Sequence, residues 1–211
     1  MFLCHPAELR FPPVENADED GLLAIGGDLR VERLLLAYRS GIFPWYSEGQ
    51  PIIWWSPDPR FVLFPGQLRI SKSMSRILRS DRFHSTWDTD FPAVIKQCRF
   101  APRAGQSGTW ITPRMEAAYC DLHRAGHAHS IEVWQNDELV GGLYGVIVGR
   151  CFCGESMFSR VSNASKYALI KLVERLKAIG IELIDSQVPN PHMMSLGAKH
   201  IPRSEYLTYL Q

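Results

Sequence analysis

The sequence predicts an α/β (α+β) protein in which a mixed sheet packs against helices. Apolar residues recur with a helical period up to Gly126, then with a period of two from Ala128 to Ser159, and one helix and one strand follow. The chain has 211 residues, of which 45% are hydrophobic and 21% charged. These values are typical of a folded protein with one large domain, or one large and one small domain.

Hydropathy and cysteine content exclude several protein classes. No apolar stretch approaches the roughly 18 residues of a membrane span, and the first 16 residues have no signal-peptide pattern. The five cysteines have no framework spacing, which favours reduced thiols. We therefore expect a monomeric cytoplasmic protein that makes no membrane contact.

The first 60 residues are acidic and end in an unusual aromatic segment. Asp28 as an N-cap and Gly41 as a terminator predict a helix over 29–40. Residues 41–60 contain four prolines and three tryptophans. The prolines predict that no regular element forms there, and the tryptophans indicate a loop that either covers the core or lines a site. We place a domain boundary here, with a small domain over 1–60 and a larger one over 61–211.

A basic segment opens the second part of the chain, after a short strand over 61–64. Residues 61–125 carry 10 basic and 5 acidic side chains, although the net charge of the whole chain is only +1. Ser71 predicts a helix start, and Lys72, Arg76 and Arg79 then share one helix face. The positive charge is densest at five side chains, Arg69, Lys72, Arg76, Arg79 and Arg82. Such a cluster can hold phosphates, and the alternative is a solvated helix face.

The remaining elements follow from capping residues and periodicity. Asp90 predicts a helix to about residue 100, and Thr112-Pro113 predicts another that ends at Gly126. Three strands over 130–134, 138–148 and 150–159 form a predicted meander. A helix over 162–178 precedes a strand over 181–188.

Three polar side chains late in the chain are candidates for chemistry. Asp185 and Gln187 lie two apart on the predicted strand and so on one face, where Asp185 can fix the Gln187 amide and present its carbonyl oxygen to an amine. The alternative is a strand end that faces water. Glu155 lies among aromatic residues, glycine and methionine, which suits either a structural ion pair or a counter-charge for a cationic ligand.

Apolar residues and possible zinc ligands in this part of the chain also have two interpretations each. Leu143, Phe152, Met157, Leu169 and Ile184 can line an apolar pocket, although core packing is the commoner use of such residues. Histidines and cysteines over 123–153 are zinc-ligand types, but their spacing argues against a zinc site. No phosphate-binding glycine motif or nucleophile elbow occurs.

Nine ordered motifs together resemble a known family. The chain is similar to the bacterial leucyl/phenylalanyl-tRNA–protein transferases, which move Leu or Phe from aminoacyl-tRNA to the N-terminus of a protein. The motifs are GLLAIGGDL (21–29), GIFPWYS (41–47), WWSPDPR (54–60), GTWIT (108–112), GHAHSIEVW (126–134), CGESMFS (153–159), NASK (163–166), IDSQV (184–188) and SLGA (195–198).

The resemblance implies a fold and a set of roles. The larger domain is expected to have a GCN5-type acetyltransferase-like fold, without metal or cofactor. Adenosine binding falls on Trp45 and Trp110, with Tyr38, Tyr119 and Asn190 nearby. The aminoacyl side-chain pocket falls on Leu143, Phe152, Met157, Leu169, Leu172 and Ile184. The reaction centre falls on Glu155, Asp185 and Gln187, with Asn190 beside it, and the basic helix is expected to hold the tRNA backbone.

The implied partners are Leu-tRNA or Phe-tRNA and acceptor proteins that begin with Arg or Lys. Gln187, held by Asp185, would aim the acceptor amine at the ester carbonyl, and Glu155 would face the acceptor's positive side chain. Two other functions stay open at this point. One is a FemX-like tRNA-dependent peptidyl transferase, and the other is a tRNA-binding module without catalysis.

Overall fold

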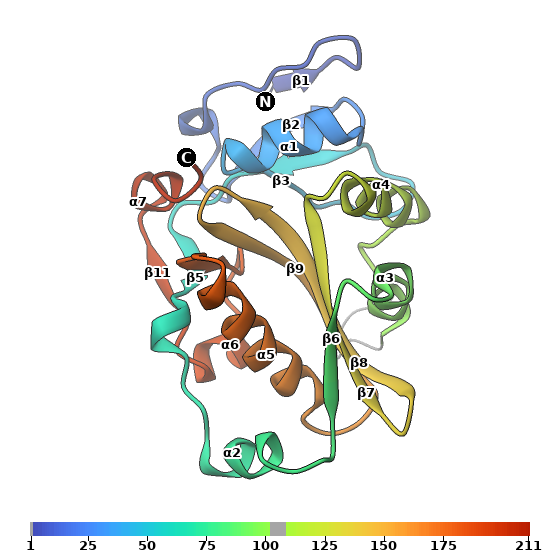
Figure 1. The fold of residues 1–211 in the computed structure, drawn as a ribbon. Coiled ribbons are helices and arrows are strands. Elements are labelled where there is room, and N and C mark those ends of the chain that lie inside the picture. Colours follow the sequence, from blue (N-terminus) through green and yellow to red (C-terminus); the bar gives the residue numbers. More distant parts are fainter. Residues whose placement is uncertain (1, 102–108) are drawn as a thin grey trace.

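The computed structural model describes residues 2–101 and 109–211, whose strands form two sheets with helices around them (Figure 1). The smaller sheet has the order β1-β2-β4-β3, and the larger one the order β11-β5-β10-β9-β8-β7-β6. The smaller sheet lies at the end of the molecule that also holds α1. No helix in the described ranges is both long and apolar enough to cross a membrane.

The smaller sheet uses the first 55 residues, including part of the aromatic segment. Its strands are β1 (Phe2–Cys4), β2 (Leu22–Gly26), β3 (Phe43–Pro44) and β4 (Ile53–Trp55). The prediction that 41–60 holds no regular element was wrong. Pro44 is tolerated because β3 is an edge strand, and Trp54 is fully buried with its Nε1 donating to the Gly26 carbonyl at 2.9 Å.

The predicted meander is confirmed in the larger sheet. Strands β7 (Ala128–Gln135), β8 (Glu138–Val148) and β9 (Cys151–Ser159) pair antiparallel, and β10 (Leu183–Asp185) pairs parallel to β9 after the crossover helix α5 (Ala164–Ala178). The α/β class and the mixed sheet are therefore confirmed. The other strands are β5 (Arg60–Leu63), β6 (His84–Trp87) and β11 (Lys199–Ile201).

Helices cover both faces of the larger sheet. On one face α3 (Phe91–Phe100) and α4 (Pro113–Arg124) bury side chains against Tyr144 and Val146, and on the other α5 packs against Leu143 and Phe152. Helix α1 (Val31–Arg39), within the predicted range 29–40, joins the first of these clusters, so both sheets share one core. The shorter helices are η1 (Val14–Asn16), η2 (Pro65–Gln67), α2 (Lys72–Leu78), α6 (Pro191–Ser195) and α7 (Arg203–Leu207).

The sheet divides between β9 and β10, and this division positions the site. The two strands pair only from Leu183↔Cys151 to Asp185↔Cys153, while β9 continues to Ser159 on β8 alone. The strand predicted over 181–188 thus ends at Asp185. The chain leaves the sheet because Gln187 has a φ of 53°, a left-handed conformation that a strand does not contain.

Candidate active site

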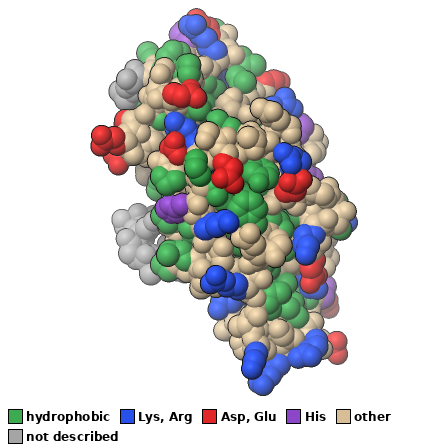
Figure 2. Space-filling view, turned by 90° about the vertical axis from the view of Figure 1, so that its left-hand side faces the viewer, with side chains coloured by type: hydrophobic (Ala, Val, Ile, Leu, Met, Phe, Trp, Pro, Cys, Tyr) green, Lys and Arg blue, Asp and Glu red, His purple; other side chains and the backbone are tan. Residues whose placement is uncertain are grey.

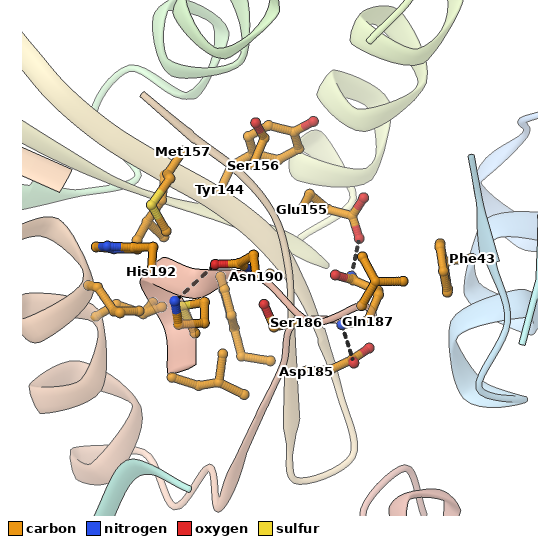
Figure 3. Close-up of a pocket in the computed structure, with 18 of the residues that line it drawn as sticks. Phe43, Tyr144, Glu155, Ser156, Met157, Asp185, Ser186, Gln187, Asn190 and His192 are labelled. Atoms are coloured by element: carbon orange, nitrogen blue, oxygen red, sulfur yellow. Dashed lines mark hydrogen bonds between the residues drawn. The ribbon is translucent and has the colours of Figure 1, made fainter. Parts of the chain in front are cut away.

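A pocket of about 460 Å³ opens where β9 and β10 separate (Figure 3). Its walls come from both sheets and from α5, with Phe43 from β3 and His192 from α6 among them. All six residues predicted for an aminoacyl side-chain pocket line it, namely Leu143, Phe152, Met157, Leu169, Leu172 and Ile184. Their assignment to an aminoacyl group stays a prediction.

The apolar wall follows from the alternation of strands and the spacing of a helix. Leu169 and Leu172 lie three apart on α5 and so share a face, opposite Leu143 of β8 and Phe152 of β9. A Cβ on Gly145 would lie 2.5 Å from the Phe152 ring, so the glycine leaves room for that ring. The wall is therefore apolar both on its strand side and on its helix side.

Two tryptophans border the pocket on the side of the smaller sheet. Trp45 and Trp110 both line it, and Trp45 is 40% exposed although its ring is large and apolar. Trp55 donates from Nε1 to the Trp45 carbonyl at 2.8 Å and so fixes the backbone beneath that ring. An exposed ring on a fixed backbone suits stacking on a base. Gly108 of the predicted GTWIT motif lies outside the described residues.

Tyr38 and Tyr119 differ from the expectation that they lie near adenosine as stacking groups. Both rings are buried, at 1% and 0% exposed, and neither lines the pocket. Their hydroxyl groups contact each other and donate to the Glu155 carboxylate, at 2.7 Å from Tyr38 and 2.9 Å from Tyr119. The tyrosines thus hold the carboxylate, whereas the sequence suggested a structural ion pair or a cationic ligand as its partner.

The environment of Glu155 shifts its ionisation toward neutral pH. Burial raises the pKa of Glu155 to about 7, against the hydrogen bonds from Tyr38 and Tyr119 that lower it, while the Asp185 charge raises it and Arg60 lowers it. The carboxylate also accepts a hydrogen bond from Gln187 Nε2 at 3.3 Å. Glu155 can therefore exchange a proton near neutral pH.

Asp185 and Gln187 interact differently from the prediction. Asp185 is fully buried, and Oδ1 accepts from the backbone nitrogen of Gln187 at 2.9 Å rather than from its side-chain amide. The amide is held by Glu155 instead, and both contacts are drawn in Figure 3. Arg60 forms a bidentate pair with Asp185, a partner that sequence reasoning missed because it is 125 residues away in the chain.

The comparisons with known proteins decide the family. A family model described as "Leucyl/phenylalanyl-tRNA protein transferase" matches residues 62–211, and one for the N-terminal domain of such proteins matches residues 27–58. The transferase of that name from Pseudomonas syringae pv. syringae is 57% identical over 96% of this chain and 89% of its own length. That from Flavobacterium johnsoniae is 56% identical over 97% of this chain and 96% of its own length. The chain belongs to the leucyl/phenylalanyl-tRNA protein transferase family. The resemblance seen in the sequence is confirmed, and the protein is an aminoacyltransferase.

Solved structures with a similar fold are much more distant. A GCN5-related N-acetyltransferase from Kribbella flavida has a TM-score of 0.41 and 11% identity, over 79% of this chain and 58% of that chain. L-PGS from Bacillus licheniformis has a TM-score of 0.43 and 13% identity, over 80% of this chain and 54% of that chain. Both TM-scores are too low to indicate a shared function.

Two further polar side chains of this transferase line the pocket. Asn190 lines the pocket, and its Oδ1 caps α6 by accepting from the Met193 nitrogen at 2.9 Å. His192, which sequence reasoning missed, also lines it, and burial together with the charge of Lys166 lowers the pKa of His192. Over 2–101 and 109–211, no three His, Cys, Asp or Glu side chains are grouped closely enough to hold a metal ion.

Lys72 and Arg76 lie on α2 and Arg79 at its C-cap, at the end of the molecule where Figure 2 shows several Lys and Arg groups. The Arg69 nitrogen donates to the Leu196 carbonyl at the end of α6. Ser71 caps α2, as predicted, by accepting from the Met74 nitrogen at 3.2 Å. All five predicted phosphate-binding groups are exposed, namely Arg69, Lys72, Arg76, Arg79 and Arg82. Their exposure makes them available to a polyanion.

Proposed function

We propose that this chain moves Leu or Phe, and Met less well, from aminoacyl-tRNA to the N-terminal Arg or Lys of acceptor proteins. The new peptide bond would mark those proteins for degradation in the cytoplasm, with the enzyme acting as a monomer. The observation that carries the proposal is one pocket with an apolar wall, an exposed tryptophan at its border and a polar end around Glu155 and Gln187. Those are the three surfaces that an aminoacyl ester of adenosine and an attacking amine require.

The aminoacyl-adenosine end of the tRNA is assigned to the tryptophans and the apolar wall. Stacking of the terminal adenine on Trp45 and Trp110 would contribute about 1–3 kcal/mol per base. In this arrangement the part of the chain over 1–60 supplies Trp45, while the part over 61–211 supplies Trp110 and the side-chain pocket. Asn190, which also lines the pocket, is assigned to the adenosine side.

Gln187 is proposed to orient the attacking amine. Its Nε2 donates to Glu155 at 3.3 Å, which leaves the amide oxygen to accept a hydrogen bond from the amine. The lone pair of that amine would then face the ester carbonyl carbon. Positioning can supply most of the rate because the ester is already activated and no covalent enzyme intermediate is needed.

The reaction is balanced without a cofactor. The amine nitrogen forms a bond to the carbonyl carbon, and the bond from that carbon to the 3′-oxygen of the terminal ribose breaks. The proton that the amine loses balances the proton that the 3′-oxygen gains, and the neighbouring 2′-hydroxyl or a water molecule can carry it. An amide is too weakly basic to keep the proton, so Gln187 acts by orientation.

Glu155 is proposed to act in its ionised form. A carboxylate accepts a stronger hydrogen bond from the Gln187 amide than a neutral carboxyl group does. Its negative charge also attracts the positive side chain of an acceptor protein that begins with Arg or Lys. The pKa of about 7 makes this charge depend on pH in the cellular range. Tyr38 and Tyr119 favour the ionised form because both donate to it.

Transfer of labelled Leu from charged tRNA to a peptide that begins with Arg tests this function. The same peptide with an acetylated N-terminus is the control, since it has no free amine. Transfer to the free peptide alone supports the proposal. Transfer to a peptidoglycan precursor but not to the peptide would favour the FemX-like function, and tight binding of tRNA without any transfer would favour a binding module.

A further inference from the structure

Arg60 is a fully buried arginine directly beneath the polar end of the site. Its guanidinium donates to both oxygens of Asp185, from Nε at 2.8 Å and from Nη2 at 2.7 Å. Its Nη1 donates to the Gly41 carbonyl at 3.2 Å. The flat group also lies between two rings, with Cζ 4.8 Å from the Phe43 centroid and 4.6 Å from the Tyr206 centroid. The guanidinium thus contacts a carboxylate, a carbonyl group and two aromatic rings.

These contacts join the two sides of the site. Asp185 holds the backbone nitrogen of Gln187, and the backbone carbonyl oxygen of Gln187 accepts at 3.4 Å from the nitrogen of Phe61, which follows Arg60 in the chain. On the other side, Phe43 lines the pocket and precedes Trp45 by two residues. One guanidinium therefore lies between the strand that leads to Trp45 and the turn that carries Gln187.

The left-handed backbone of Gln187 makes this support necessary. A φ of 53° is unfavourable for a residue with a side chain, and a change of the turn would move the amide away from the amine. The contact that opposes such a change is the one from Asp185 Oδ1 to the Gln187 nitrogen. Asp185 in turn has its carboxylate plane set by the fork of Arg60, and Tyr206 adds a hydrogen bond to Oδ2 at 3.1 Å.

Stability by itself gives no reason for a buried ion pair here. Taking both charges out of water is costly, and apolar replacement of such a pair is often neutral or stabilising. An apolar pair could not orient the Gln187 backbone, because only a carboxylate in a fixed plane can accept a hydrogen bond from the Gln187 nitrogen at a set angle.

We propose that Arg60 is a positioning residue for aminoacyl transfer, which acts through Asp185 to hold Gln187 at the required distance from the aminoacyl ester. This inference rests on the proposed function, because it assigns Arg60 a task in that reaction. Arg60 itself is not among the residues that line the pocket.

Replacement of the fork by a point charge tests the proposal. Arg60→Lys keeps the charge but loses the bidentate geometry, and a displacement of about 1 Å at a reacting group can lower a rate about 10²-fold. We expect the single-turnover rate at saturating enzyme to fall by about 10- to 100-fold, while the dissociation constant for Leu-tRNA changes less than about twofold. In a Gln187→Ala background, the same substitution should lower the remaining rate by less than about threefold, because the group it positions is absent.

Arg33→Lys is the matched control. Arg33 is also fully buried, but its partners are Asp28 and the carbonyls of His5, Pro6 and Glu8, none of which lines the pocket. Its replacement should leave the transfer rate within about twofold of wild type. Should Arg60→Lys fail to fold, Tyr206→Phe in the same two backgrounds is used, since it removes one hydrogen bond to Asp185.

The outcomes separate this inference from the proposed function. If the wild-type protein does not transfer Leu to the peptide, the proposed function is wrong. If wild type transfers Leu and the folded Arg60→Lys variant loses the same factor in both backgrounds, or loses none, Arg60 does not act through Gln187 and the inference is overturned. With Tyr206→Phe as the substitute, a loss of the same factor in both backgrounds overturns it, because the support of Asp185 then does not act through Gln187.

Discussion

The two tyrosine hydroxyls on Glu155 should set the pH at which the enzyme becomes active. Tyr38→Phe removes a 2.7 Å hydrogen bond to Oε1 and leaves the ring in its buried place. A hydrogen bond to a charged group contributes about 1.5–3 kcal/mol, and 1.36 kcal/mol corresponds to about one pKa unit. The pKa of Glu155, now about 7, should therefore rise by about one to two units.

The direction of the change in transfer rate depends on which ionisation state of Glu155 is active. If the ionised carboxylate is needed, the transfer rate rises with pH through the pKa of Glu155. With the smaller shift, the ionised fraction at pH 7 falls from about one half to about one tenth, so the rate at that pH falls about fivefold. The rate at high pH should return close to that of wild type.

Single-turnover transfer of Leu to a peptide beginning with Arg, followed from acidic to alkaline pH, measures this shift. The acceptor amine titrates nearby, with a pKa of about 7.7–8, but its contribution is the same for both proteins. Spontaneous hydrolysis of the ester is subtracted from a sample without enzyme. The shift of the midpoint between variant and wild type then reports on Glu155.

Tyr167→Phe is the control, because Tyr167 is a buried tyrosine whose hydroxyl donates to the Phe83 carbonyl at 3.0 Å and not to Glu155. It should leave the midpoint in place. A Tyr38→Phe enzyme with the wild-type midpoint and a uniformly lower rate would refute the reasoning, since the hydroxyl would then matter for structure and not for the ionisation of Glu155.

The other binding and reacting groups have separate expected effects. Replacement of Lys72, Arg76 and Arg79 together by Glu should flatten the slope of log K against log salt by about 2–3 units in filter binding, and an unchanged slope would place the tRNA elsewhere. Trp45→Ala should weaken binding of Leu-tRNA by about 1–3 kcal/mol in the same assay, whereas equal binding would exclude stacking on that ring. Gln187→Ala should lower single-turnover transfer about 10²- to 10⁴-fold with little change in tRNA affinity, and weaker binding at a normal rate would contradict its role. With matched tRNAs, Leu and Phe should transfer faster than Val or Ile, because branching at Cβ crowds the apolar pocket, and equal rates for Leu and Ile would count against this pocket.

Long elements with a clear period could be predicted from the sequence, and several of the shortest could not. The strands of the meander, β7, β8 and β9, and the helix α5 are long enough to repeat their period several times. Strands β1, β4 and β11 have three residues each, which is too few to show alternation. Their pairing depends on neighbours that lie far away in the chain.

The residue types at the site could be predicted, but their partners could not. The residues of the apolar wall were assigned to a pocket by the family resemblance, since apolar side chains alone favour core packing, and Glu155 was singled out because a carboxylate is rare in such surroundings. Its contact with Tyr38 joins residues 117 apart in the chain, and no local pattern indicates which polar groups meet at that distance. The strand assignment of Gln187 failed for a local reason, since the contact from Asp185, two residues earlier, favours a left-handed turn over continued pairing.

The same buried polar contacts determine both the site and the way the two sheets meet. Tyr38 comes from α1 and reaches Glu155 on β9, while Arg60 connects Asp185 to the Gly41 carbonyl beside β3. Each contact is polar and largely removed from water, so losing one partner leaves the other unpaired at a cost of about 1–3 kcal/mol, and more where a charge remains. A variant at these positions therefore changes the free energy of unfolding together with the chemistry. Rates from such variants report on mechanism only when they are compared between backgrounds that differ in one reacting group, with the folded fraction measured in each.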